Sequence, residues 1–196
     1  GKQVVRVVPY KHNKDNPFIE LFFHYSLGNN KTYMSPSSFG RPDPVAEFAD
    51  KLKSTGNKDE WIQGKRLEPK MRTFAPVVVR GKESEGVKFW GFGKTVYQEL
   101  LGVIADPDYG DITDVDNGVD FTLTYTLPKT KGAFPQTNLV PKRKSSALAK
   151  NKGTIKERLE SVPEISTLFQ RKSPADVKAI LESFLNPSEG PIVDDI

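Results

Sequence analysis

A series of short segments rich in β-branched and aromatic residues, separated by turn signals, most constrains the fold of this chain. Residues Val119–Leu127 alternate apolar and polar side chains cleanly, which is typical of a strand with one buried face. Further segments of strand character are residues 4–8, 18–27, 31–34, 73–80 and 86–93. The pattern predicts an α+β protein that is mainly β. Five strands with an internal helix are compatible with an OB-fold, a five-stranded partly open barrel, and other small barrels fit nearly as well.

Helix signals occur at four places. Asp43-Pro44 favours a helix start, because Asp caps a helix and Pro fits its first position, and the spacing predicts a helix over 44–54. Apolar spacing predicts a second helix over 95–104. After residue 153, capping-box patterns at Thr154 and at Ser173 predict two short helices, a small C-terminal annex.

The expected domain organisation follows from these segments. Residues 1–127 form the OB-fold core, with a subdomain inserted at about residues 28–60. Residues 128–153, which contain seven basic and no acidic residues, are expected to be a basic loop or linker. Residues 154–196 are expected to form the helical annex and the start of an acidic tail.

Composition excludes several classes of protein. The chain of 196 residues has no cysteine, which excludes disulfides, thiol nucleophiles and cysteine zinc sites. Its two histidines, His12 and His24, leave little for a histidine metal site or a catalytic triad. No apolar run approaches the length of a membrane span, and the N-terminus lacks the apolar core of a signal peptide. We therefore expect a soluble, cytoplasmic protein that is not an enzyme.

Charge is segregated along the chain. Residues 61–94 contain eight basic and three acidic residues, whereas residues 106–120 contain six Asp and no base. Segregated charge gives a polarised surface, and a basic surface attracts polyanions.

The basic region also contains aromatic residues at strand spacing. In Gly86–Lys94 the period of a strand places Lys88, Trp90, Phe92 and Lys94 on one face. A groove for single-stranded nucleic acid needs this mixture, since cations follow the phosphates and flat rings stack on the bases. The alternative is that both rings pack in the core while the lysine stems extend to water.

Other basic residues extend this candidate site. Lys70, Arg72 and Phe74 share strand parity, and we expect them to face the same groove as Trp90; alternatively, Phe74 opens a core strand. Arg66 is a further candidate cation. Three consecutive bases, Lys142, Arg143 and Lys144, precede two serines and are a phosphate-binding candidate, with a solvated linker as the alternative.

Two motifs fail on inspection. Gly93-Lys94-Thr95 resembles the end of a phosphate-binding loop, but Lys88 stands where the motif requires glycine. The Asp residues of 106–120 lack the glycine and the final Glu of a calcium loop, so an acidic hairpin rim is the better interpretation. We therefore predict no catalytic residue and no metal site.

Several segments resemble the gene-32-type single-stranded DNA-binding proteins of T-even-like bacteriophages. They are Arg6–Pro9, Pro17–His24, Lys70–Val79, Glu85–Lys88, Phe92–Lys94, and Gly110-Asp111 before Gly118–Thr124. The resemblance covers roughly residues 4–127, and the later half is more similar to the cyanophage branch. It implies an OB-fold that coats single-stranded DNA cooperatively during replication, recombination and repair, in the cytoplasm of the infected host. It also implies that Arg72, Phe74 and Trp90 contact DNA, Phe74 and Trp90 by stacking.

The resemblance carries expectations about cofactors and partners. T-even members hold zinc with one His and three Cys; His24 stands at the His position, but residues 35–38 (Ser-Pro-Ser-Ser) occupy the Cys region, so we predict no zinc. Neighbouring copies of the protein are expected partners, as are phage replication proteins recruited by an acidic tail that would begin at residues 194–196. The same chemistry would also suit a single-stranded RNA-binding OB module or a replisome scaffold protein.

Overall fold

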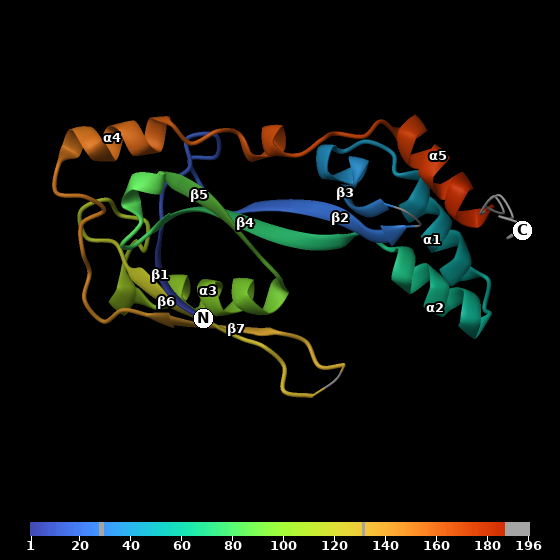
Figure 1. Ribbon diagram of the computed structural model, residues 1–196, viewed down its shortest axis with the longest axis horizontal. Coiled ribbons are helices and arrows are strands. Elements are labelled where there is room, and N and C mark those ends of the chain that lie inside the picture. Colours follow the sequence, from blue (N-terminus) through green and yellow to red (C-terminus); the bar gives the residue numbers. More distant parts are fainter. Residues whose placement is uncertain (28–29, 131, 187–196) are drawn as a thin grey trace, which may run out of the picture. The chain divides into compact units, whose positions relative to one another are not determined.

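The computed structural model describes residues 1–27, 30–130 and 132–186. The chain divides into two compact units (Figure 1): unit 1 contains residues 1–20 and 72–165, and unit 2 contains residues 21–71 together with the chain from residue 166 onward. The described residues form seven strands and five α-helices, so the expected mixed α and β class is confirmed. In this part of the chain no helix is long and apolar enough to cross a membrane.

The strands and helices have the following bounds. The strands are β1 (Lys2–Val7), β2 (Ile19–Leu27), β3 (Asn30–Met34), β4 (Lys70–Val79), β5 (Val87–Phe92), β6 (Asp120–Thr126) and β7 (Gln136–Pro141). The helices are α1 (Pro44–Ser54), α2 (Lys58–Leu67), α3 (Lys94–Ala105), α4 (Lys152–Glu160) and α5 (Pro174–Leu185).

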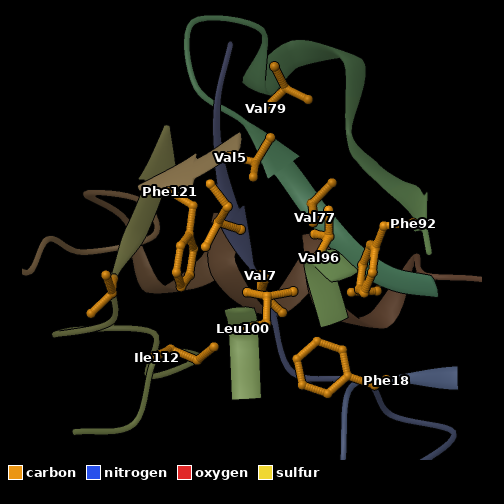
Figure 2. Close-up of a cluster of buried hydrophobic side chains, with 13 residues drawn as sticks. Val5, Val7, Phe18, Val77, Val79, Phe92, Val96, Leu100, Ile112 and Phe121 are labelled. Carbon is orange, nitrogen blue, oxygen red and sulfur yellow. The ribbon is translucent and has the colours of Figure 1, made fainter. Parts of the chain in front are cut away.

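Unit 1 is built on five antiparallel strands in the order β5-β4-β1-β6-β7. One face of this sheet is the core, where Val5, Val77 and Phe121 meet Val96 and Leu100 of α3 (Figure 2). Among the described residues no pairing joins β5 to β7, so the sheet is open and not a closed barrel, and the expected OB-fold is not confirmed by the strand pairing. Instead, α3 begins directly after β5 and packs against β7.

The segment expected to be a basic linker contains strand β7. Its residues pair with β6 in continuous register, from Thr126↔Gln136 to Phe121↔Pro141. The expectation of a loop throughout was wrong here, because cross-strand pairing outweighs a composition typical of loops. Beyond β7, Leu148 is buried with Val8 and Ile155 in a second apolar cluster of the same unit.

Helix boundaries follow the caps. Asp43 caps α1 and Ser173 forms the capping box of α5, as expected. The capping box expected at Thr154 is not formed, because α4 starts earlier, with Asn151 accepting a hydrogen bond from the Gly153 amide. Helix α2, capped by Asn57, was not expected from the sequence.

Unit 2 combines the β2–β3 hairpin with α1, α2 and α5. Its core contains Leu27 and Tyr33 from the hairpin, together with Val45, Leu67 and Val177 from the three helices. Helices α1 and α2 approach closely at Gly64, where an added Cβ would lie 2.6 Å from the carbonyl oxygen of Ala49. The turn expected at residues 28–30 lies largely outside the described residues.

Candidate nucleic-acid interface

The pairing of β4 with β5 decides which candidate residues share a face. Trp90 lies opposite Ala75, and Phe74 lies opposite Gly91. Directly opposed residues point to the same side of a sheet, so Trp90 shares the core-facing side of Ala75, and Phe74 lies on the other side. Phe74 was expected to face the same groove as Trp90, and this was wrong, whereas Arg72 does line one groove with Trp90 and Phe92. The alternation of side chains between the two faces was predicted correctly within each strand. The register that pairs β4 with β5, however, places Phe74 opposite Gly91 and not opposite Trp90.

The two aromatic residues of β5 differ in exposure. Phe92 is only 3% exposed and belongs to the core of unit 1, whereas Trp90 is half-buried and packs against that core. Their ring centroids lie 4.4 Å apart. Phe92 thus belongs to the core and contacts Trp90, and Trp90 is the ring of the pair that stays partly exposed in the groove.

Phe74 and Arg72 lie beside two glycines of β5. A Cβ added to Gly91 would lie 2.7 Å from a ring carbon of Phe74, so the Phe74 ring covers this glycine. An Arg72 guanidinium nitrogen lies 3.6 Å from the position of a Cβ on Gly93. Gly93 is also the N-cap of α3, so the Arg72 guanidinium lies at the junction between the end of β5 and the start of α3.

A groove of about 780 Å³ in unit 1 brings part of the candidate site together. Its lining from β4, β5 and α3 includes Arg72, Trp90, Phe92, Thr95 and Glu99, and its lining from the β6–β7 hairpin includes Tyr125, Phe134, Gln136 and Asn138. Phe134 is 87% exposed and Tyr125 is 48% exposed. The groove therefore has a half-buried indole on one wall, exposed rings on the other, and a guanidinium between strand and helix.

Sequence reasoning missed the contribution of the hairpin. Phe134 falls in the stretch interpreted as a linker, and Tyr125 was assigned only to the alternating face of a strand. A signal was present, since Phe134 stands between Gly132 and Pro135, two residues that mark a turn or loop. The pairing of β6 with β7 brings both rings to one end of the hairpin, where Tyr125 lies opposite Thr137.

The remaining candidate cations do not line this groove. Lys88 and Lys94 are exposed, and Lys88 forms an ion pair with Glu85, which lowers the pKa of that carboxyl. Arg66 and Lys70 belong to unit 2, where Lys70 donates a hydrogen bond to the carbonyl oxygen of Lys65. Among the predicted residues, the structure brings only Arg72, Trp90 and Phe92 to the groove.

The basic triplet Lys142–Lys144 is an exposed loop that is anchored at both ends. The amide of Lys142 donates to the Asp120 carbonyl oxygen, and the amide of Ser146 donates to that of Gly118. This loop follows Pro141, at the opposite end of β7 from Gln136 and the groove. The triplet is therefore held by the fold and is not part of a free linker.

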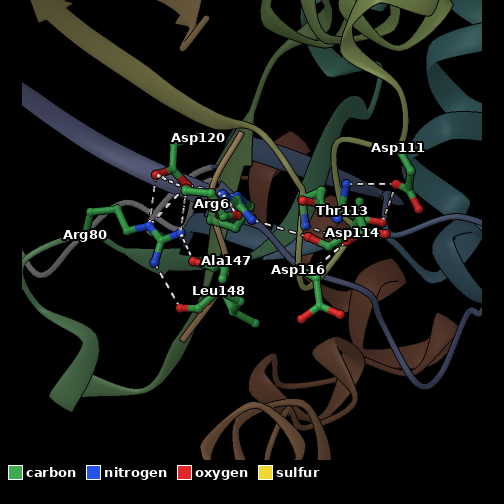
Figure 3. Close-up of polar contacts among 11 residues, drawn as sticks. Arg6, Arg80, Asp111, Thr113, Asp114, Asp116, Asp120, Ala147 and Leu148 are labelled. Carbon is green, nitrogen blue, oxygen red and sulfur yellow. Dashed lines mark hydrogen bonds and ion pairs between the residues drawn. The ribbon is translucent and has the colours of Figure 1, made fainter. Parts of the chain in front are cut away.

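A buried ion-pair network fixes the chain that follows the triplet (Figure 3). Arg6 is 1% exposed and contacts Asp120 at 2.8 Å, and Arg80 contacts the same carboxylate at 3.1 Å. Arg80 also donates hydrogen bonds to the carbonyl oxygens of Ala147 and Leu148. Two cations on one carboxylate thus hold the return chain against β1 and β6.

Within the stretch 106–120, which was expected to form an acidic hairpin rim, residues 111–117 form turns closed by their own Asp side chains. Asp111 accepts hydrogen bonds from the amide and hydroxyl of Thr113, and Asp114 accepts from the amides of Asp116 and Asn117 (Figure 3). The carboxylates therefore stabilise their own turns. No group of three or more His, Cys, Asp or Glu side chains in the described residues has the geometry of a metal site.

His24 does not fit a zinc site. Its Nε2 lies 2.7 Å from Asp43 Oδ2 and its Nδ1 lies 3.1 Å from the carbonyl oxygen of Leu67, so both ring nitrogens have protein partners. Ser35, from the region where relatives have cysteine, contacts the same Asp43 oxygen. Burial alone would raise the pKa of Asp43, but hydrogen bonds to His24 and Ser35 outweigh it and lower the pKa. Asp43 also caps α1, so one carboxylate joins β2, the chain after β3, and α1.

The open β-sheet, with a groove that has several aromatic rings and one arginine, defines a class of small β-domain suited to binding an extended polyanion with flat groups. Comparison with known proteins gives the family. The model named gp32 DNA binding protein like matches residues 1–185, so the chain belongs to this family. A single-stranded DNA-binding protein of Enterobacteria phage T2 is 25% identical over 201 residues. That match covers 87% of this chain and 65% of the relative, so the chain spans less than two thirds of the relative's length.

Proposed function

We propose that this protein is a non-enzymatic single-stranded DNA-binding protein, which coats and protects the strand during phage replication, recombination and repair. The observation that carries the proposal is the groove of unit 1. It presents Trp90 on one wall and Phe134 on the other, with Arg72 between β5 and α3. Membership of the gp32-like family supports the same function.

The chemistry of the groove favours a single strand over a duplex. Stacking on an aromatic ring contributes about 1–3 kcal/mol per base and tolerates any base, because every base has a flat face. In a duplex those faces are covered by neighbouring base pairs. Phosphates would contact Arg72, with the exposed Lys88 and Lys94 as further contacts along the strand.

The topology of unit 1 supports an OB-fold. The order β5-β4-β1-β6-β7 with α3 between β5 and β6 is that of a five-stranded barrel left open at one seam. OB-folds bind oligonucleotides on the face of their second and third strands and on the loop joining the last two. In this chain those elements are β4, β5 and the β6–β7 hairpin, and all three line the groove.

Several parts of this proposal extend beyond the groove. We infer that neighbouring copies contact one another on the strand and that the protein acts in the cytoplasm of the infected host without zinc or another cofactor. Replication proteins would be recruited by an acidic tail beginning at residues 194–196, which lie outside the described residues. Arg66, Lys70 and the triplet Lys142–Lys144 would add phosphate contacts outside the groove.

A competition assay tests the function. Labelled oligo(dT) is bound and then competed with poly(dT), poly(U) or duplex DNA at one salt concentration. We expect poly(dT) to compete best and duplex DNA to compete poorly. Equal or better competition by poly(U) would indicate an RNA-binding module. Failure of the labelled oligo(dT) to bind would indicate a scaffold protein whose basic surface serves acidic protein partners.

A further inference from the structure

Both walls of the groove contain polar side chains without protein partners. Glu99 of α3 lines the groove together with Gln136 and Asn138 of β7. Within the described part of the chain, the structure records no ion pair and no side-chain hydrogen bond for any of the three. Glu99 and Asn138 are exposed, so their polar atoms are available to a ligand.

An acid in a groove for a polyanion needs a physical reason. A carboxylate repels phosphate, so a strand in this groove is favoured when its phosphates lie toward Arg72 and its bases toward Glu99. Thr95 and Glu99 are four residues apart on α3 and both line the groove, so this face of the helix forms part of the wall. A base stacked on Trp90 would then direct its polar edge toward α3 and β7.

We propose that Glu99 reads the edges of bound bases and gives the protein a preference for bases that carry an exocyclic amino group. This inference rests on the proposed binding of single-stranded DNA and adds a base preference to it. An ionised carboxylate only accepts hydrogen bonds. Cytosine, adenine and guanine offer an amino group as donor, and Glu is a known partner of the cytosine amino group.

Thymine is the base that this arrangement disfavours. It lacks an amino group, and its one ring N–H lies between two carbonyl oxygens that repel a carboxylate. We therefore expect oligo(dC) to bind about five-fold more tightly than oligo(dT) of equal length, the size of effect that one charge-assisted hydrogen bond in a partly open site produces. A preference of this size biases affinity by base composition and still permits coating of any sequence.

The test compares two substitutions at Glu99 on oligo(dC) and oligo(dT). Glu99→Leu removes both the charge and the acceptor, so we expect oligo(dT) binding to strengthen and the five-fold preference to disappear. Glu99→Gln removes the charge but keeps a carbonyl acceptor, so binding to both oligonucleotides should strengthen while part of the preference remains. Glu157→Leu is the matched control, because it removes one negative charge from an exposed position on α4 outside the groove.

The outcomes separate this inference from the proposed function. Equal affinity of the unsubstituted protein for oligo(dC) and oligo(dT), or a preference that survives Glu99→Leu, overturns the role of Glu99 while the binding function stands. The role of Glu99 is also overturned if Glu99→Leu and Glu157→Leu change the affinities for oligo(dC) and oligo(dT) by the same factors. If the unsubstituted protein binds neither oligonucleotide, the proposed function itself is wrong.

Discussion

The ring of Trp90 lies 4.4 Å from the ring of Phe92, centroid to centroid, at an interplanar angle of 48°. Phe92 and Trp90 share one face of β5, but Phe92 packs in the core of unit 1 and Trp90 lines the groove. Phe92 matches the core interpretation of this strand face, and Trp90, which is half-buried and lines the groove, is the residue to which the binding interpretation applies.

Trp90→Ala is expected to weaken binding to oligo(dT) by about 1–3 kcal/mol, the usual contribution of one stacked base. Phe92→Ala is instead expected to destabilise the fold by about 3–5 kcal/mol, because it leaves a cavity in the core. Anisotropy of a fluorescently labelled oligo(dT) measures the affinity, because Trp90→Ala removes the ring whose quenching would otherwise report binding, and thermal unfolding measures the stability. Loss of stability without loss of affinity in Trp90→Ala would place this ring in the core.

Phe134→Ala is expected to reduce affinity by a similar amount, about 1–3 kcal/mol, if the exposed ring stacks on a base. Because Phe134 is 87% exposed, the unfolding midpoint should barely move. Leu127→Ala is a control on the same hairpin, since Leu127 is also exposed but does not line the groove. Equal effects of the two substitutions would argue against a specific role for Phe134.

Replacing Lys142, Arg143 and Lys144 with Ala tests the anchored basic loop. We expect weaker binding to an oligonucleotide long enough for only one protein, and a salt slope smaller by about 2, since three phosphate contacts are lost. The loop begins about 14 Å along the chain from Asn138, which lines the groove, so the oligonucleotide must reach that far. A loss seen only on long strands would mean that the triplet contacts a neighbouring protein.

Asp43→Asn is expected to destabilise the protein by about 3 kcal/mol, because it disrupts a buried pair with His24. The lowered pKa of Asp43 means that its contribution to stability is complete above the unfolded pKa of about 4 and is lost as pH falls through the folded pKa. Unfolding should therefore depend less on pH below about 4 in Asp43→Asn.

The same site gives a prediction about metal. Extensive chelation should leave the unfolding midpoint of the unsubstituted protein unchanged, because protein atoms already occupy both nitrogens of His24. Metal analysis after purification without added zinc is the matching measurement. One zinc per chain that survives chelation would contradict this account.

Much of the fold could be predicted because its signals are local. The Asp43 cap, the alternation of β6 and the helical spacing of α3 all depend on neighbouring residues. Helix α2 was missed because it is mostly polar, although Asn57 followed by two acids is an N-terminal signal. Strand β7 was missed because only its pairing with β6 makes it a strand.

The candidate site was harder to predict because it depends on register and on distant segments. The faces of β4 and β5 could be predicted separately, but their offset is set by which residues pair, such as Thr73 with Phe92. The two walls of the groove are separated by more than thirty residues in sequence, from Trp90 to Phe134. No pattern within either segment shows that they meet.

The salt dependence of binding to a short single-stranded oligonucleotide tests the central claim most directly. Affinity is measured by Trp90 fluorescence in the Trp61→Phe background over a range of salt concentrations. If about four phosphates are neutralised, the slope of log affinity against log salt should be near −3, at about −0.7 per contact for single strands. Quenching of Trp90 that saturates together with this slope supports a strand lying in the groove. A flat salt response, or binding that leaves Trp90 fluorescence unchanged, would contradict it.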